Sequence, residues 1–389
     1  MKIGIDARWI FKELSGIGSY TRELIRHLAR LDREHTFVIY FSDTTLRDRT
    51  VAETDLGHAP NFSTCLLPFG LFSIRNQLRL PGLLAEAVLD VFHSPNYMIP
   101  LRAFPRGRPG RIRCVTTIHD LIPLMFPAYA PRAWKRRFFL LYRWLMHEVA
   151  VRSDLVLTDS RSSRDDVVRH LRLPPERVLA IPLGVLPKFQ PSTHADNRAA
   201  GWTPGGARTE QTILWVGRAD PYKNLVGLIE AFAALRKQYR LPVKLRLVGP
   251  KDRRYPEASR HAAGLGVADA VTWLGYLPDD RLVSEYQHAD VFVQPSRYEG
   301  FGLSVLEAFA CGTPVICSNK GSLPEVAGGA ALIVQPQDMI GLTEAMRRVL
   351  TDFRLACDMS ARGLRQAQKF TWEATARMTL EAYKKAASL

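Results

Sequence analysis

The sequence lacks most of the features that mark secreted, membrane-spanning or disulfide-stabilised proteins. Its five cysteines are an odd and widely spread set, and no two of them form a Cys-x-x-Cys pair. Such usage favours free thiols in a reducing compartment over a disulfide framework or a zinc site. No stretch reaches the roughly 18 uncharged apolar residues that a spanning helix requires. Met1–Asp6 enters an apolar run without the parts of a signal peptide, so we expect a cytoplasmic protein.

Metal-binding patterns are also missing. The sequence contains no Asp-x-Asp motif, no close pair of histidines and no cysteine cluster, which are common sources of metal ligands. We therefore expect neither a metal nor another cofactor. The one unusual bulk property is a formal net charge of +15. Nucleic acid, an anionic membrane surface or an anionic substrate would each account for this charge, and composition alone does not choose among them.

Two series of short apolar runs alternate with longer segments of helical period. The runs cover residues 2–6, 36–41, 90–93, 114–119, 154–158 and 178–182, and then 212–217, 244–249, 271–274, 290–295, 313–318 and 331–335. Buried strands separated by helices indicate parallel sheets covered on both faces. A chain of 389 residues is also long for one hydrophobic core. The sequence therefore predicts an α/β protein with two doubly wound, Rossmann-like domains.

The predicted boundary between the two domains is a segment rich in proline, glycine and polar residues, 187–211, which is typical of a linker. Residues 1–186 form the predicted N-terminal domain and 212–370 the predicted C-terminal domain. Residues 371–389 again have helical period, and periodicity alone lets this last helix pack on either domain.

The segment Tyr298–Glu307 carries the strongest functional signal. Gly300 and Gly302 follow an apolar run and precede a new helical pattern. Such glycines let backbone N–H groups approach a ligand, and the helix directs its positive N-terminus at the same place, which suits a phosphate. Glu299 and Glu307 would repel phosphate, so we expect them to bind hydroxyl groups. The segment therefore predicts a nucleotide-sugar site.

Glu299 and Glu307, eight residues apart with Gly-Phe-Gly between them, resemble the E-x7-E signature of retaining glycosyltransferases of family 4. The resemblance covers nearly the whole chain, including residues 370–373, which are similar to the start of the family's terminal crossing helix. Residues 117–123 and 93–95 look most like bacterial mannosyl- and rhamnosyltransferases of polysaccharide assembly. The resemblance implies the GT-B fold, in which two domains face a central cleft, and a last helix that crosses back to the N-terminal domain.

The resemblance also implies roles for particular residues. Arg218 and Lys223 match the pair that binds the donor pyrophosphate in the family. The forked guanidinium of an arginine and the ammonium of a lysine, placed just after a strand, suit that task. Glu299 and His119 are expected to contact the transferred sugar as catalytic residues, with Asp120 orienting His119. The remaining expected donor-binding residues are Gly300, Phe301, Gly302, Leu303, Glu307, Gly16, Gly18, Gly249, Tyr276 and Leu277.

The reaction implied is retaining, metal-independent transfer of a hexose, best taken as mannose from GDP-mannose, to a glycan or lipid-linked acceptor. Because the resemblance places Glu299 on sugar hydroxyls, we prefer a same-face displacement to a covalent intermediate. A GT-B-type epimerase or phosphorylase is the alternative. A basic nucleic-acid-binding protein is a remote one, because no nucleic-acid motif is present.

The expected contact with a membrane comes from residues 131–152. This segment interleaves six basic residues with tryptophan, phenylalanine and leucine. A basic helix of this composition is typical of a membrane interface, although an ordinary helix with its apolar face in the core is the alternative. We therefore predict peripheral association with the inner face of the cytoplasmic membrane.

Overall fold

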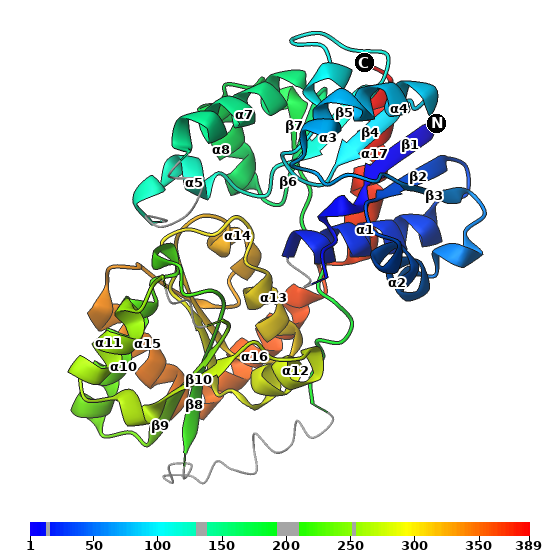
Figure 1. Cartoon of the computed structure of the whole chain (residues 1–389). Coiled ribbons are helices and arrows are strands. Elements are labelled where there is room, and N and C mark those ends of the chain that lie inside the picture. Colours follow the sequence, from blue (N-terminus) through cyan, green and yellow to red (C-terminus); the bar gives the residue numbers. More distant parts are fainter. Residues whose placement is uncertain (13–15, 130–137, 193–209, 251–253) are drawn as a thin grey trace. The chain divides into compact units, whose positions relative to one another are not determined.

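The structure is a computed structural model that describes residues 1–12, 16–129, 138–192, 210–250 and 254–389 (Figure 1). The contacts within it divide the chain into two compact units. Unit 1 comprises Met1–Leu124, Phe138–Gly184 and Thr371–Leu389, and unit 2 comprises Met125–Arg137 and Val185–Phe370. The chain therefore passes from unit 1 to unit 2 twice and returns to unit 1 for its last helix.

Unit 1 is built on a parallel sheet with the strand order β3-β2-β1-β4-β5-β6-β7. Its strands are β1 (Lys2–Asp6), β2 (Thr36–Phe41), β3 (Phe62–Leu66), β4 (Val91–Ser94), β5 (Arg113–Thr117), β6 (Leu155–Thr158) and β7 (Val178–Ala180). The central strands are apolar and buried on both sides, as Ile3, Phe92 and Val115 show. Sheets of this kind need helices on both faces.

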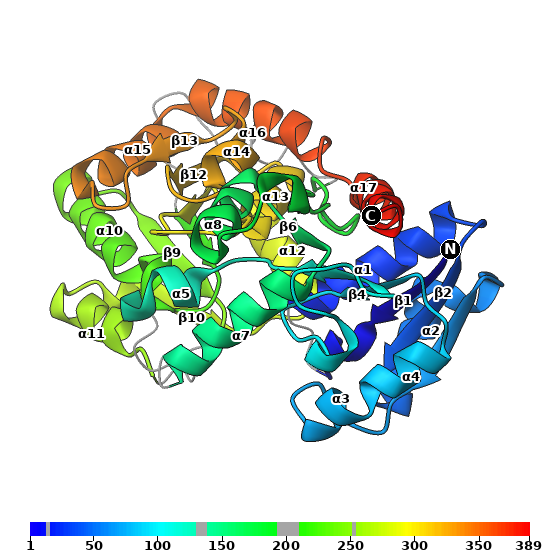
Figure 2. The same cartoon turned by 90° about the horizontal axis from the view of Figure 1, so that it is seen from above.

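The helices of unit 1 are α1 (Gly16–Leu31), α2 (Thr44–Thr54), α3 (Ile74–Leu78), α4 (Leu80–Glu86), α7 (Phe139–Arg152), α8 (Arg161–Leu171) and α17 (Trp372–Ala387), with α5 (Ile122–Met125) at the division between units. Helix α1 buries Leu24, Ile25 and Leu28 completely. Figure 2 shows α17 lying beside α1, and both belong to unit 1.

The last helix is fixed to unit 1 by polar and close backbone contacts. Thr371 caps its N-terminus by accepting from Ala374 N, and Thr375 Oγ1 donates to Pro182 O at 2.7 Å. A Cβ on Gly184 would lie only 2.1 Å from Trp372 N, so the two backbones meet there because residue 184 has no side chain.

Unit 2 is built on a second parallel sheet, with the order β10-β9-β8-β11-β12-β13. Its strands are β8 (Gln211–Val216), β9 (Val243–Val248), β10 (Val271–Gly275), β11 (Val291–Gln294), β12 (Val315–Ser318) and β13 (Leu332–Val334). Trp215, Phe232 and Val293 are among the buried side chains of its core.

The helices of unit 2 are α10 (Leu225–Tyr239), α11 (Glu257–Gly264), α12 (Asp279–His288), α13 (Leu303–Ala310), α14 (Leu323–Ala327), α15 (Met339–Thr351) and α16 (Phe353–Ala367). Helix α10 buries Leu228, Ile229 and Phe232, and α15 buries Leu342 and Met346 in the same core.

The predicted fold class is confirmed, since both units are parallel α/β sheets. Each predicted apolar run overlaps a strand, but β3 was not predicted. This strand pairs only with β2 at the edge of the sheet, and its Ser63 and Thr64 are exposed, so it lacks an apolar run. Most of the predicted linker, 193–209, lies outside the described residues.

Candidate active site

Three glycines lie together at the carboxyl edge of the unit 2 sheet. Gly217, Gly249 and Gly275 follow or end the neighbouring strands β8, β9 and β10. Gly249 has a φ of +138° and donates from its N–H to Gly275 O at 2.8 Å, and a Cβ there would lie 1.8 Å from Gly217 O. Only glycine fits this position. Tyr276 and Leu277 come directly after this edge, with Tyr276 well exposed.

The centre of the candidate site is an ion pair between Lys223 and Glu299. Lys223 ends the 3-10 turn η6 (Pro221–Lys223) after β8, and Glu299 lies in the loop between β11 and α13. Because β8 and β11 are neighbours, residues 76 positions apart meet at one sheet edge. Lys223 Nζ donates to both carboxylate oxygens of Glu299, at 2.8 Å and 2.7 Å.

The two oxygens of the Glu299 carboxylate have different surroundings. Oε1 also accepts from Gln294 Nε2 at 2.7 Å and from Ser296 Oγ at 2.6 Å. Among the described residues, Oε2 accepts from Lys223 only. The carboxylate is therefore held in place through Oε1, while Oε2 keeps accepting capacity for a ligand.

The loop that carries Glu299 is held from behind by small residues. A Cβ on Gly321, whose φ is +59°, would lie 2.3 Å from Glu299 O. Ser322 Oγ donates to Glu299 O at 3.1 Å and to Phe301 O at 2.5 Å. Ser318 Oγ donates to Ser296 O at 2.5 Å. The backbone on both sides of Glu299 is therefore fixed by hydrogen bonds.

Helix α13 begins directly after this loop. Gly302 is its N-cap with a φ of +103°, and a Cβ there would lie 2.8 Å from Leu323 Cδ2. Gly302 has no side chain with which to cap the helix. The N–H groups of a first turn have no partners within the helix, and they carry its positive end. Gly300, Phe301, Gly302 and Leu303 therefore lie where an anion is attracted, with Phe301 buried against Phe370.

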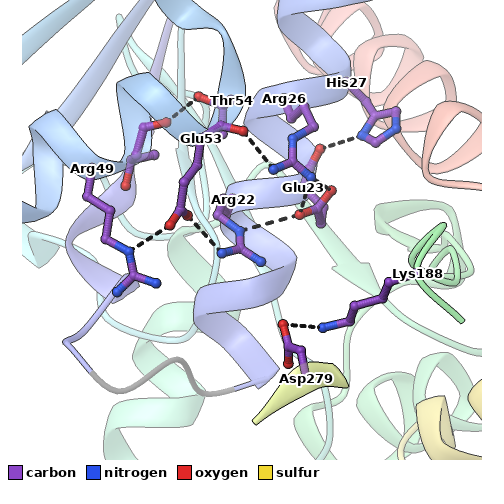
Figure 3. A network of polar contacts seen from close by, with 10 residues as sticks. Arg22, Glu23, Arg26, His27, Arg49, Glu53, Thr54, Lys188 and Asp279 are labelled. Carbon is purple, nitrogen blue, oxygen red and sulfur yellow. Dashed lines mark hydrogen bonds and ion pairs between the residues drawn. The ribbon is translucent and has the colours of Figure 1, made fainter. Parts of the chain in front are cut away.

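Glu307 lies on the second turn of α13 and has a tyrosine partner that sequence reasoning missed. The hydroxyl of the fully buried Tyr286 donates to Glu307 Oε2 at 2.8 Å. Burial raises the pKa of Glu307, and this hydrogen bond and the charge of Lys188 offset part of the rise. Lys188 itself pairs with Asp279 at 2.5 Å (Figure 3).

Arg218 follows β8 and points its charge largely into solvent, with 58% of its side chain exposed. Its nearest carboxylate is that of Asp220, at 3.4 Å. Because an ion pair with one exposed partner contributes little, Arg218 stays able to exchange Asp220 for a phosphate.

In unit 1, His119 follows β5 and has an acceptor at each ring nitrogen. Nδ1 lies 2.7 Å from Asp159 Oδ2, and Nε2 lies 3.0 Å from Pro95 O. A carboxylate and a carbonyl only accept, so both contacts are hydrogen bonds only if both nitrogens carry protons. Burial alone would lower the pKa of His119, but the charge and hydrogen bond of Asp159 raise it above its ordinary value. The two acceptors and the raised pKa both favour the imidazolium form of His119.

The orienting partner of His119 is thus Asp159, and the prediction that Asp120 plays this part was wrong. The Asp120 carboxylate accepts from Ile122 N at 3.0 Å and so caps the next turn of the chain. The two aspartates were indistinguishable in sequence, because Asp159 is 40 residues away and comes into place through the pairing of β5 with β6.

A buried hydrogen-bonded chain lies behind His119. Tyr383 OH on α17 lies 2.7 Å from His93 Nδ1, and His93 Nε2 lies 2.9 Å from Thr117 Oγ1. Thr117 Oγ1 in turn lies 3.1 Å from Tyr20 OH, and the Tyr20 ring meets His119 edge to face. Burial lowers the pKa of His93 to about 3, so this histidine is neutral near pH 7, whereas the pKa of His119 is raised.

Gly16 and Gly18 form the first turn of α1, which a salt bridge and a hydrogen bond tie to α2. Arg22 pairs with Glu53 of α2 at 2.9 Å, and Arg26 donates to Glu53 O at 2.7 Å while it pairs within α1 with the buried Glu23 at 2.6 Å (Figure 3). A Cβ on Gly16 would meet nothing within 4 Å. A larger side chain would therefore fit at this position within unit 1, so packing does not explain the glycine. Its expected role at a ligand stays a prediction.

The described residues contain neither a metal-binding cluster nor a membrane-spanning helix. Across the described ranges, His, Cys, Asp and Glu side chains form no group of three or more that would hold a metal ion. Within the same part of the chain, no helix has the length and apolarity to cross a membrane. Helix α7 exposes Leu140, Leu141 and Trp144 while burying Tyr142 and Met146. The basic residues predicted at 132–137 lie outside the described residues.

Two protein families match the chain, one in each half. The family described as Glycosyltransferase Family 4 matches residues 14–188, and the family described as Glycosyl transferases group 1 matches residues 204–369. The first match covers most of the unit 1 sheet, and the second covers the unit 2 sheet with the ion pair and helix α13.

Curated relatives and a solved structure agree with these matches. The chain is 32% identical to the O-antigen chain mannosyltransferase B of Escherichia coli, over 99% of this chain and 100% of that protein. It is 30% identical to the serotype-specific mannosyltransferase WbdA of Escherichia coli, over 75% of this chain but 35% of that protein. The sucrose-phosphate synthase from Thermosynechococcus elongatus superimposes with a TM-score of 0.70 at 23% identity, over 99% of this chain and 98% of that one. These likenesses confirm the GT-B fold.

The charged state of His119 leads to a pH-dependent prediction. Because its pKa is raised in the folded chain, the stabilisation from its proton is complete below about 6.5 and is lost as the pH rises through the raised value. We expect Asp159→Asn to lower the free energy of unfolding more at pH 6 than at pH 9, as measured by urea denaturation.

The matched control for this prediction is Asp165→Asn, which removes an exposed carboxylate from the same unit. Its effect should be small at both pH values. An effect of Asp159→Asn that is the same at pH 6 and pH 9 would contradict the charged His119–Asp159 pair.

Proposed function

The chain belongs to the family 4 glycosyltransferases, and we propose that it transfers mannose from GDP-mannose to a hydroxyl of a glycan or lipid-linked acceptor. The full-length likeness to a mannosyltransferase of O-antigen chains supports mannose and a place in cell-surface polysaccharide assembly. The observation that carries the proposal is the Lys223–Glu299 pair beside the uncapped N-terminus of α13. It joins a cation, a hydroxyl acceptor and a helix end that attracts anions at one sheet edge.

The leaving nucleoside diphosphate would be stabilised by groups that the fold already holds in position. The ammonium of Lys223 has three N–H donors, and its two contacts with Glu299 leave one of them for a phosphate oxygen. Arg218 supplies a planar fork, and the first turn of α13 supplies backbone N–H groups. Preorganised charges of this kind lower the energy of the departing phosphate without a metal. We therefore propose a metal-independent reaction.

Glu299 would bind a hydroxyl of the transferred sugar through Oε2, since Oε1 already accepts three hydrogen bonds. A carboxylate in contact with an ammonium and held by further donors has its charge stabilised, which makes it a poor nucleophile. This favours retention by same-face displacement, in which the leaving phosphate takes the acceptor proton. The sugar–oxygen bond to phosphate breaks as the bond to the acceptor oxygen forms.

The other predicted residues would each contact one group of the donor, His119 from unit 1 and the rest from unit 2. His119 has its Asp159 bond at 2.7 Å and a longer bond to Pro95 O at 3.0 Å, so a sugar hydroxyl would take over the longer one. Glu307 Oε1 would accept a ribose hydroxyl while Tyr286 holds Oε2. The glycine edge at Gly249, the exposed Tyr276 and the half-buried Leu277 would border the base.

We also propose that unit 1 contacts an anionic membrane surface through α7. This helix exposes Phe138, Leu140, Leu141 and Trp144 at and near its start, beside Arg143. Apolar and aromatic side chains next to basic ones are typical of helices that lie in a membrane interface. Peripheral association would bring the enzyme to a lipid-linked acceptor.

A panel of nucleotide sugars tests the donor. A donor at a concentration of 100 times its Kd stabilises the folded chain by about 2.7 kcal/mol, so we expect GDP-mannose to raise Tm more than UDP-glucose or dTDP-rhamnose. Product analysis with GDP-mannose should then show mannose on an added glycan acceptor. Release of mannose 1-phosphate with inorganic phosphate, or a changed sugar nucleotide without acceptor, would instead show a phosphorylase or an epimerase.

Substitutions around the ion pair test the catalytic assignment. Misplacing a positioning group by 1 Å costs up to about 100-fold in rate, so Ser296→Ala should lower kcat by about 10-fold to 100-fold and Glu299→Ala by more. Ser360→Ala is the matched control, because Ser360 Oγ donates to Gly312 O at 2.6 Å within the same unit and away from the loop that carries Glu299. Full turnover by Glu299→Ala would refute its proposed role.

Flotation tests the membrane proposal. The full chain should float with vesicles of phosphatidylcholine and phosphatidylglycerol but not with phosphatidylcholine alone, and the double variant Leu140→Ala/Trp144→Ala should float less. Ile340→Ala is the control, since Ile340 is 84% exposed in unit 2. Absence of the wild-type chain from the floated anionic vesicles would contradict the proposal.

A further inference from the structure

Four aromatic side chains gather at the carboxyl ends of β1 and β4 in unit 1. Trp9 lies in the 3-10 turn η1 (Ala7–Trp9) that follows β1, and it is the centre of the group. Its ring meets those of Phe72 and Tyr97 at 5.8 Å and that of Phe11 at 6.3 Å between centroids, all nearly edge to face. We call Trp9, Phe11, Phe72 and Tyr97 the aromatic cluster.

The cluster is partly open to solvent although its centre is buried. Phe72 is 64% exposed and Phe11 is 43% exposed, whereas Trp9 is 4% exposed. The Trp9 indole N–H is buried, and it has no hydrogen-bond acceptor among the residues that the structure describes. A buried donor without an acceptor is costly, so an acceptor group brought by a ligand would relieve that cost.

The segments that carry the cluster are held rigidly from beneath. Arg8, next to Trp9, is buried and donates to both oxygens of Asp6 at 2.8 Å and 2.6 Å. The same guanidinium donates to Asn76 Oδ1 at 2.8 Å, which fixes helix α3 next to Phe72. Rings that are ordered before binding lose little entropy when a ligand arrives.

The cluster shares a loop with the candidate catalytic histidine. The loop after β4 presents Pro95 O to His119 Nε2 at 3.0 Å, and two residues later it presents the Tyr97 ring to Trp9. Ser94 Oγ holds this loop by donating to Asn96 O at 2.6 Å and to Met98 O at 2.8 Å. A ligand on the cluster would therefore lie beside the group proposed to contact the transferred sugar.

We propose that the aromatic cluster is the subsite for the acceptor glycan. A pyranose ring has an apolar C–H face, which suits exposed aromatic rings, and a rim of hydroxyl oxygens, one of which would accept from the Trp9 indole N–H. An acyl chain offers no such acceptor, and the aromatic cluster itself contains no charged side chain to bind an anion. The inference rests on the proposed function, because only a glycosyltransferase needs a second sugar, the acceptor, next to His119.

Acceptor kinetics test this subsite, with GDP-mannose saturating and methyl α-mannotrioside varied. An aromatic contact contributes enough that its loss costs a few-fold to about tenfold in affinity. Phe72→Ala and Phe11→Ala should therefore raise the KM for the trioside by about three- to tenfold. Trp9→Phe, which keeps a ring and deletes the N–H, should raise it as well. The KM for GDP-mannose and the slow hydrolysis of GDP-mannose without acceptor should stay unchanged in all three.

The matched control is Ile74→Ala, which lies two residues after Phe72 at the start of α3, is likewise exposed, and should leave the KM for the trioside unchanged. Variants that leave this KM unchanged, or that change the KM for GDP-mannose equally, overturn the subsite. Weaker flotation of Phe72→Ala with unchanged kinetics would overturn it in favour of a membrane contact. If wild-type chain neither turns over the trioside nor binds it in the presence of GDP, the subsite is also rejected, whereas failure of the proposed function would show as absent GDP-mannose turnover.

Discussion

The ion pair between Lys223 and Glu299 is the interaction on which the site in unit 2 depends. Both partners are largely removed from water, and a buried ion pair contributes little net stability because desolvation offsets the attraction. Its retention with two further donors from Gln294 and Ser296 is therefore better explained by positioning than by stability. The pair holds an ammonium and a carboxylate oxygen with spare capacity at a single sheet edge, and every other contact of the loop serves to keep them there.

The sheet edge that carries the ion pair is lined by backbone atoms. Gly249 lies against Gly217, Gly321 lies against Glu299, and Gly302 starts α13 at a positive φ where a Cβ would meet Leu323. Each of these positions excludes a side chain for a steric reason within unit 2 itself. The result is a surface of peptide groups next to the two charges, and peptide N–H groups are the part of a protein that approaches a phosphate most closely. Close packing of the strand ends and the proposed binding of an anion thus both require glycine at these positions.

Most strands could be predicted because parallel strands are continuous apolar runs in the sequence. The exception was the edge strand β3, whose Ser63 and Thr64 are exposed to water. The positions of Glu299, Lys223 and Gly302 could be predicted because these residues stand beside strand ends and helix starts. The hydrogen-bond partners of the candidate site residues could not be predicted. Asp159 reaches His119 across 40 residues and Tyr286 reaches Glu307 across 21, and such pairs follow from strand order and rotamers that one sequence does not display. The prediction that Asp120 orients His119 was wrong for the same reason, because it assumed that the neighbour in sequence is the neighbour in space.

His93 and His119 of unit 1 show why the hydrogen-bond partner of a histidine matters more than the residue type. His93 meets two hydroxyl groups and its pKa is lowered, while His119 meets a carboxylate and a carbonyl and its pKa is raised, which favours the charged form. Glycosyl transfer passes through a transition state with positive charge on the sugar ring, and a lone imidazolium nearby would raise its energy. Paired with Asp159, His119 adds no net charge. It can therefore offer an N–H to a sugar hydroxyl without opposing the charge that develops on the ring, which makes Asp159 as necessary to the proposed role as the histidine itself.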